Sequence, residues 1–238
     1  MKIRFITNLC FELTFADGRR LLTDPWFAEG AFYGSWHNFP PVPTELKEVI
    51  VGNYYHWIYI SHLHPDHCDK KTLAQFPKNT KIVIGKFPHN HLRRVIEGLG
   101  FTNILEISFR KKCDLDGLNI VMFDDFASSN TGVISNVQYT LDTSFLIQDI
   151  DGEKIFNCVD NPIRLVDADA IFTEHGNVDV AILPLGGASS YPHAFYCHSK
   201  KRNCRKRPIK RQQLFKNLLT SRKPYKPKQL FPQLAITF

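Results

Sequence analysis

Four side chains suited to binding a transition metal lie within six residues of one another in the sequence SHLHPDH, which begins at Ser61. An apolar run precedes them, and we expect it to form a strand. Because a strand repeats every two residues, His62 and His64 should leave its end on the same side. The proline that follows ends the ladder, so Asp66 and His67 should come from the next turn. Neutral imidazoles and a carboxylate are donors that Zn²⁺ and Fe²⁺ prefer, and the cluster therefore predicts a metal centre at a strand terminus.

Two predicted hairpins each lead to an aspartate. Residues 3–15 alternate loosely and are expected to form one strand, which turns at Asp17-Gly18 and returns before Asp24. Residues 143–158 contain a similar hairpin, which Asp160 follows closely. The repetition suggests an internally duplicated β sandwich with a loop aspartate in each half.

Helical and extended segments alternate in the rest of the chain. Residues 89–100 carry apolar side chains at helical spacing and predict an amphipathic helix that packs on a sheet. Further strands are expected at 57–60, 81–84, 104–107, 118–123, 178–183 and 229–231. This alternation favours a mixed α/β protein, and we expect one domain over residues 1–238.

The motif His62-x-His64-x-Asp66-His67, placed after an apolar strand, resembles the signature of the metallo-β-lactamase superfamily. The resemblance implies an αββα sandwich with a metal site at one edge of two sheets, and hydrolysis as the default reaction. The segments most similar to the branch that contains lactonase-like, phospholipase-D-like and CMP-sialic-acid-hydroxylase-like proteins lie at 35–36, 40–41, 160–161, 187–192 and 226–228.

The same resemblance implies a role for each site residue. His62 and His64 would bind one metal ion, Asp66 and His67 would bind a second, and Asp160 would bridge the two ions. Zinc is the expected metal, as one or two ions, with iron or manganese as alternatives. Asp66 is also the expected catalytic residue, which would orient the nucleophile or accept its proton. Asp24 would lie behind the ligands and fix a histidine.

Two histidines of the family pattern are missing from this sequence. The position after the strand at 118–123 is occupied by Asp124-Asp125, and residues 231–235 contain no histidine. Either aspartate is a candidate oxygen ligand that would favour iron or manganese over zinc, and the alternative is that both are ordinary turn residues. Among other residues, we expect His175 and Asp169 in loops, and we expect no second metal site at His193, Cys197, His198 and Cys204.

The composition fits a single globular domain. The chain has 238 residues, of which 43% are hydrophobic. No run of eighteen or more apolar residues occurs, so no transmembrane segment is predicted. Six cysteines are scattered along the chain without a C-x-x-C pair, which favours a soluble protein in a reducing, cytoplasmic compartment.

The formal net charge of +7 divides into an acidic body and a basic segment. Residues 200–228 contain 13 of the 30 Lys and Arg residues and no Asp or Glu, which leaves 17 basic side chains against all 23 acidic ones elsewhere. Such a segment is suited to binding nucleic acid or another anion, and it is equally consistent with a solvated basic helix.

These observations predict a metal-dependent hydrolase that uses metal-activated water. Its expected substrate is an anionic small molecule with an ester, lactone or phosphoester bond. Two alternatives remain open: a degenerate metal-binding or nucleic-acid-binding module with a basic arm, and an iron-dependent redox enzyme. Metal content separates the redox enzyme from the hydrolase, and salt-dependent binding of nucleic acid would identify the binding module.

Overall fold

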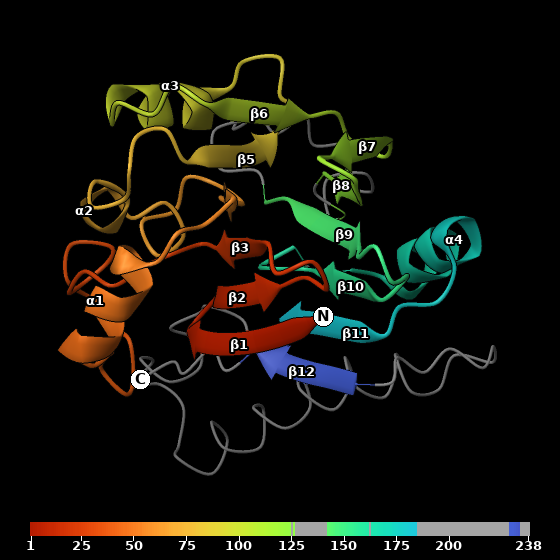
Figure 1. Ribbon diagram of the computed structural model, residues 1–238, viewed down its shortest axis with the longest axis horizontal. Helices are drawn as coiled ribbons and strands as arrows, with labels where there is room; N and C mark the ends of the chain where they lie inside the picture. The colour runs from red at the N-terminus through yellow and green to blue at the C-terminus, as the bar shows by residue number, and fades with distance from the viewer. Residues whose placement is uncertain (125, 127–141, 162, 185–228, 234–238) are drawn as a thin grey trace, which may run out of the picture.

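The computed structural model describes residues 1–124, 126, 142–161, 163–184 and 229–233, which form two six-stranded sheets and four helices (Figure 1). The strands of the first sheet are, in spatial order, β1 (Lys2–Thr7), β2 (Cys10–Thr14), β3 (Arg20–Thr23), β4 (Trp57–Tyr59), β5 (Lys81–Gly85) and β6 (Ile104–Ile107). Those of the second sheet are β12 (Gln229–Gln233), β11 (Val180–Pro184), β10 (Lys154–Asn157), β9 (Ser144–Gln148), β8 (Leu118–Phe123) and β7 (Lys112–Leu115). The helices are α1 (Thr44–Gly52), α2 (Lys70–Leu73), α3 (His91–Gly98) and α4 (Leu165–His175).

The central core lies between the two sheets. Successive side chains of a strand point to opposite faces, so Trp57 and Tyr59 of β4 join the central cluster while Ile58 belongs to an outer one. The central cluster also contains Phe145 of β9, whose ring centroid lies 4.8 Å from that of Tyr59. The aromatic pair therefore joins the sheets near the end at which β4 leads into the histidine motif.

Helices cover the outer face of each sheet. Ile50 of α1, Leu73 of α2 and Ile96 of α3 are fully buried in one cluster with the outer side chains of the first sheet. Ile171 of α4 belongs to a third cluster, with the outer side chains of the second sheet. Figure 1 shows the first three helices on one side of the molecule and α4 on the other. The α/β architecture and the αββα sandwich are therefore confirmed.

The first hairpin differs from the expected one. Residues 3–15 form two strands rather than one, because the chain turns at Asn8, whose φ of 44° is left-handed. Asparagine tolerates this conformation better than most residues, and this signal was missed. The Asp17-Gly18 turn is confirmed, with Gly18 at a φ of 85°, and β2 pairs with β3 across it. The hairpin of β9 and β10 is confirmed as well.

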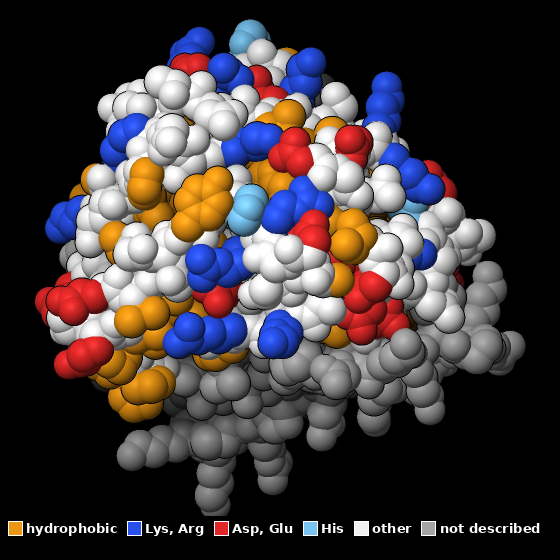
Figure 2. Space-filling model, viewed as in Figure 1, with side chains coloured by type: hydrophobic (Ala, Val, Ile, Leu, Met, Phe, Trp, Pro, Cys, Tyr) orange, Lys and Arg blue, Asp and Glu red, His pale blue; other side chains and the backbone are white. Residues whose placement is uncertain are grey.

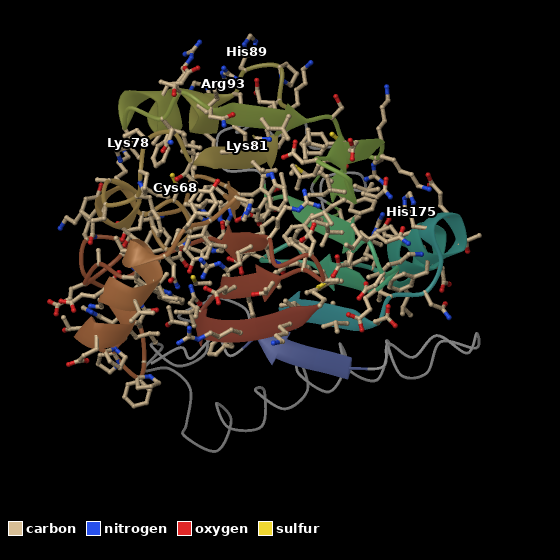
Figure 3. All side chains as sticks on the ribbon, in the orientation of Figure 1. Cys68, Lys78, Lys81, His89, Arg93 and His175 are labelled. Atoms are coloured by element: carbon tan, nitrogen blue, oxygen red, sulfur yellow. The ribbon has the colours of Figure 1, made fainter. Side chains whose placement is uncertain are left out.

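Helix α4 corrects the expectation that Asp169 and His175 lie in loops. Ala168, Ile171 and His175 are buried on the face of α4 that contacts the second sheet, and their spacing of three and four residues is helical. Acidic residues between them interrupt the apolar pattern, so the segment did not stand out. Figure 3 shows His175 on α4, well separated from Cys68, which directly follows the histidine motif.

Several predictions concern residues outside the described part of the chain. They include Asp125, the loop at 187–192, the cluster from His193 to Cys204 and the basic segment 200–228. On the face shown in Figure 2, acidic and basic side chains of the described residues are interspersed. None of the helices described here has the length and apolar character needed to span a membrane.

Candidate metal centre

The histidine motif begins where β4 ends, as its spacing predicts. The backbone N–H groups of His67 and Cys68 both donate to the carbonyl oxygen of His64, at 3.0 and 2.8 Å. This turn brings His67 back towards His62, with ring centroids 4.1 Å apart. Asp69 then ends the loop by accepting the N–H of Lys71 as the N-cap of α2.

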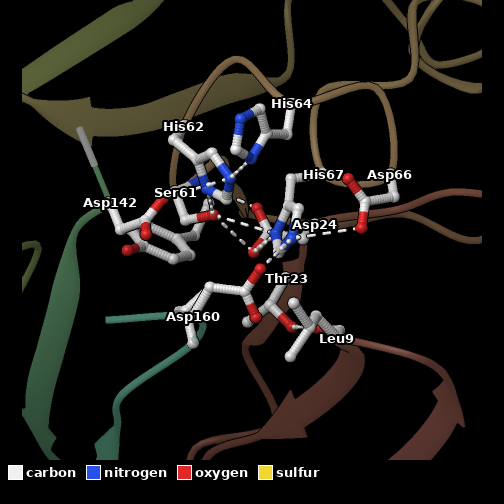
Figure 4. Close-up of polar contacts among 12 residues, drawn as sticks. Leu9, Thr23, Asp24, Ser61, His62, His64, Asp66, His67, Asp142 and Asp160 are labelled. Carbon is white, nitrogen blue, oxygen red and sulfur yellow. Dashed lines mark hydrogen bonds and ion pairs between the residues drawn. The ribbon is translucent and has the colours of Figure 1, made fainter. Parts of the chain in front are cut away.

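The structure brings all five predicted ligands into one cluster (Figure 4). His62 Nε2 lies 2.7 Å from His64 Nδ1, and His67 Nε2 lies 3.2 Å from Asp160 Oδ2. Asp66 Oδ2 is 3.6 Å from the same nitrogen of His67. The potential ligand atoms of His62, His67 and Asp160 all lie within 4.8 Å of one another, which is close enough to share one ion.

Asp24 lies behind the histidines and holds them in place. Its Oδ1 accepts the backbone N–H of Ser61 at 2.8 Å, and its Oδ2 accepts the Ser61 hydroxyl at 2.8 Å. Oδ2 also lies 3.1 Å from His67 Nδ1, so this carboxylate orients the ring and leaves Nε2 facing the cluster. Asp24 is 1% exposed and has a φ of 36°, in the left-handed region. The geometry agrees with the position expected for Asp24.

Burial and neighbouring charges set the protonation of the histidines. Burial lowers the pKa of His62 well below its usual value and also lowers the pKa of His64, so both imidazoles are neutral at pH 7. Burial opposes the charged form of His67 as well, but hydrogen bonds with Asp160 and Asp24 outweigh it and raise the pKa of His67 well above its usual value. The carboxylates of Asp24 and Asp160 thus favour a positive charge at His67, and either a proton or a metal cation can supply it.

The carboxylates of the cluster differ from one another. Burial raises the pKa of Asp66. Burial also disfavours ionised Asp160, but its hydrogen bond with His67 and the nearby charge of that ring outweigh this effect and lower the pKa of Asp160. Asp66 is therefore protonated more readily than Asp160.

The loop after β10 aims Asp160 at the cluster. Val159, directly before it, has a φ of 53° although it is β-branched, and its side chain is fully buried. Asn157 accepts the N–H of Val159 at 3.1 Å, and the Asn161 side chain bonds both the N–H of Phe126 and the carbonyl oxygen of Asp124. These contacts hold a strained conformation that an unconstrained loop would relax.

Sequence reasoning missed Asp142, the residue that lies two positions before β9. Its Oδ1 is 3.1 Å from His62 Nε2, and it forms a second potential three-ligand group with His62 and His64. Asp124, which we had considered as an oxygen ligand, instead pairs with Arg110 at 2.8 Å and belongs to neither group at this centre. A signal was available: in a hairpin, the residues before its first strand and after its second lie at the same end, so Asp142 should accompany Asp160.

An aromatic turn lies beside the centre. Ala31 and Trp36 exchange two backbone hydrogen bonds that close the turn, and Gly34 has a φ of 82°. The Phe32 ring packs edge-on against His64, with centroids 5.6 Å apart, and Tyr33 is fully exposed. The cluster therefore has an apolar wall on its His64 side.

Comparison with known proteins gives matches over most of the chain. Residues 2–201 match the family described as Beta-lactamase superfamily domain. The chain is 31% identical over 179 residues to a Putative Rieske 2Fe-2S iron-sulfur protein of Mycolicibacterium smegmatis, across 74% of this chain and 32% of that protein. It is 28% identical over 204 residues to the cytidine monophosphate-N-acetylneuraminic acid hydroxylase of Mus musculus, across 82% of this chain and 32% of that protein. The chain thus spans about a third of the length of these curated relatives.

Solved structures share the fold at lower identity. An isothiocyanate hydrolase from Delia radicum gut bacteria superposes with a TM-score of 0.59 at 18% identity, covering 77% of this chain and 71% of that one. CmlA, a diiron beta-hydroxylase from Streptomyces venezuelae, superposes with a TM-score of 0.56 at 17% identity, covering 86% of this chain and 39% of that one. Given the family match and the shared fold, the chain belongs to the beta-lactamase superfamily, as the resemblance of its histidine motif to the metallo-β-lactamases predicts.

Proposed function

We propose that this protein is a metal-dependent hydrolase whose metal ions are held by His62, His64, Asp66, His67 and Asp160. The observation that carries the proposal is the meeting of three imidazoles and two carboxylates at one end of the sandwich. Imidazole nitrogens and carboxylate oxygens together suit zinc, iron and manganese. Zinc, as one or two ions, is the first expectation for the metal.

Two features of the cluster fit a bound cation. His62 and His64 are neutral, which is the form that binds metals. The Oδ1 atom of Asp66 is buried and makes no hydrogen bond within the described residues. A buried carboxylate oxygen without a partner is costly, and a cation would satisfy it.

The residues of the centre have separable roles in hydrolysis. A bound metal ion lowers the pKa of water towards 7 and polarises a carbonyl or phosphoryl group. Asp66 is proposed to orient the attacking water or accept its proton, and to return that proton to the leaving group. Asp24 keeps His67 oriented, and Phe32 of the aromatic turn packs against the His64 ring.

The proposed substrate is a small anionic molecule with an ester, lactone or phosphoester bond. A bound metal ion would attract its charge, and Phe32 with Tyr33 would contact an apolar part. The basic segment 200–228 is proposed to add affinity for the anion, with nucleic acid as the alternative partner. Binding of nucleic acid by the protein without any metal ion would favour this alternative.

We further propose one domain over residues 1–238 and a cytoplasmic location. The described cysteines, Cys10, Cys68, Cys113 and Cys158, are all free thiols, which supports a reducing compartment. Fractionation of cells, together with alkylation of the native protein, would test this assignment.

A second function, iron-dependent oxidation, is favoured by one specific observation. Carboxylates make up a large share of the cluster, and hard oxygen donors shift preference from zinc towards iron and manganese. Relatives named as a hydroxylase and as a Rieske iron-sulfur protein agree with this alternative.

The test is elemental analysis of the purified protein, followed by two assays on each metal-loaded form. The first assay measures hydrolysis of a panel of esters, lactones and phosphodiesters. The second measures oxygen consumption by the iron form with a chemical reductant. Hydrolysis that depends on added metal supports the main proposal, whereas reductant-dependent oxygen consumption without hydrolysis would replace it with the second function.

A further inference from the structure

Asp142 lies at the cluster although no part of the histidine motif predicts it. Its side chain is 25% exposed, and its Oδ1 faces the fully buried side chain of His62 at 3.1 Å from Nε2. His64 Nδ1 lies 2.7 Å from the same nitrogen. Figure 4 shows Asp142 on the other side of His62 from His67. The cluster thus has a second group of three donors, which shares His62 with the group that contains His67 and Asp160.

Hydrogen bonding behind the motif fixes which nitrogen of His62 carries its proton. The Ser61 hydroxyl has a single hydrogen, which it donates to Asp24 Oδ2. At the 2.9 Å contact with His62 Nδ1, the Ser61 oxygen must therefore accept, so His62 Nδ1 bears the hydrogen. The Nε2 atom of the neutral ring then presents a lone pair to the cluster.

That lone pair faces Asp142 Oδ1 at 3.1 Å and His64 Nδ1 at 2.7 Å. A lone pair and a carboxylate oxygen at 3.1 Å repel each other unless positive charge lies between them. The ligand atoms of His62, His64 and Asp142 all lie within 4.8 Å of one another, so one metal ion could bind all three. Ligand atoms bound at about 2.0–2.1 Å to a tetrahedral ion lie roughly 3.3 Å apart. The 3.1 Å between His62 Nε2 and Asp142 Oδ1 is close to this value, and His62 Nε2 and His64 Nδ1 are nearer to each other, at 2.7 Å.

We infer that Asp142 is a metal ligand, which with His62 and His64 completes one half of a two-part centre, and that it occupies the role of a missing histidine. The inference rests on the proposed function, because it requires that the centre binds metal. The other half consists of Asp66, His67 and Asp160. Two imidazoles and one carboxylate are a ligand set typical of non-haem Fe(II) sites. This half should therefore bind Fe(II) or Mn(II) more readily than a site made of imidazoles alone would.

Thr143 explains how a residue of the second sheet is held against a motif of the first. Its hydroxyl donates to the carbonyl oxygen of Ser61 at 2.9 Å. The Tyr59 hydroxyl donates to the carbonyl oxygen of Thr143 at 2.9 Å. Both Tyr59 and Thr143 have no exposed surface. This clamp fixes the backbone next to Asp142 to the residue that precedes His62, so Thr143 is a positioning residue for the proposed ligand.

The experiment measures metal binding to the full chain rather than turnover. Wild type, Asp142→Ala, Asp142→His and the control Asp124→Ala are dialysed against Mn(II), Zn(II) and, without oxygen, Fe(II). Asp124 suits the control because it lies at the same end of the second sheet but pairs with Arg110. Circular dichroism establishes that each variant is folded. Metal content and chelator competition give stoichiometry and affinity.

We expect Asp142→Ala to weaken binding of one ion per chain by at least about tenfold, since even residues that only orient ligands contribute 10- to 100-fold. Asp142→His should regain Zn(II) binding and lose preference for Mn(II), while Asp124→Ala should match wild type. Thr143→Val should weaken the same ion to a lesser extent. Affinity of Asp142→Ala equal to that of wild type would overturn the inference and leave the proposed function intact. A wild-type chain that binds none of the three metals would overturn both.

Discussion

The two sheets contribute different chemistry to the metal centre. All three imidazoles, and the aspartate that orients them, come from loops of the first sheet, whereas the second sheet supplies carboxylates only, at Asp142 and Asp160. The side chains of His62 and His67 have no exposed surface, while those of Asp142 and Asp160 are 25% and 38% exposed. The first sheet thus provides the buried, nitrogen-rich side of the centre, and the second sheet provides a more open, anionic side.

This difference predicts that the first sheet mainly sets how tightly metal is bound, whereas the second sheet mainly sets which metal is preferred. Buried imidazoles held by several hydrogen bonds are preorganised, so they should supply most of the binding energy for any borderline metal. Carboxylates on the opposite sheet add negative charge and shift preference towards harder ions. Changes on the first sheet should therefore remove metal, and changes on the second should weaken one ion or alter its identity.

The largest effect is expected for the double variant His62→Ala with His64→Ala. It removes two of the three nitrogen donors, so metal content should fall by most of the wild-type amount. Elemental analysis after dialysis measures this loss. The matched control, His89→Ala with His91→Ala, removes two histidines at the start of α3 and should keep full metal content. Unchanged stoichiometry in the first double variant would contradict the assignment of the motif.

A smaller but still large effect is expected for Asp160→Ala on the second sheet. The variant removes the carboxylate beside His67 Nε2, so metal content and any metal-dependent activity should both decrease. Asp169→Ala is the control, because Asp169 lies in α4 and the cluster does not include it. If the two variants behave alike, Asp160 is not a metal ligand, and Asp142 is left as the one proposed ligand of the second sheet.

The same division explains what could be predicted from the sequence. The first-sheet ligands lie within six residues, so strand periodicity and one proline are enough to bring them together. Most of the strands and the helix α3 were predicted because each has a clear local pattern, whereas β7 was not expected. In contrast, α1 was not expected, because of its nine residues only Ile50 is buried and its apolar run is β-branched.

The second-sheet ligands depend on contacts between distant segments. Asp142 meets His62 across 80 positions of the sequence because Thr143 bonds the Ser61 backbone and Tyr59, and no local pattern encodes that meeting. The sequence favoured Asp124 over Asp142 as a metal ligand, because Asp124 follows the strand after which the family pattern places a histidine. Its ion pair with Arg110 directs it elsewhere. The pairing of their side chains therefore determines which of two aspartates at the same end of the second sheet lies at the metal centre.

A third, intermediate effect is expected for Asp24→Asn. The amide keeps the size of the side chain, but it has one oxygen and no negative charge. It can therefore not accept hydrogen bonds from the Ser61 hydroxyl, the Ser61 N–H and His67 as the two carboxylate oxygens do. Metal affinity should fall by about 10- to 100-fold, as for other residues that orient a ligand. Chelator competition measures the change. Asp69→Asn, a buried aspartate that caps α2 in the same loop, should leave metal affinity unchanged.

The smallest effect is expected for Ser61→Ala, because the first sheet holds its ligands redundantly. The variant removes the hydroxyl that bonds Asp24 and His62, but the backbone N–H of residue 61 still donates to Asp24, and Asp24 still orients His67. A typical neutral hydrogen bond contributes about 0.5–1.5 kcal/mol, so we expect metal affinity to fall by roughly two- to twelvefold, because the contacts of Asp24 with the backbone and with His67 remain. The same chelator competition measures it beside Asp24→Asn. A loss as large as that of Asp24→Asn would mean that the hydroxyl alone sets the proton position on His62. The first-sheet side of the centre would then hold its ligands no more redundantly than the second-sheet side does.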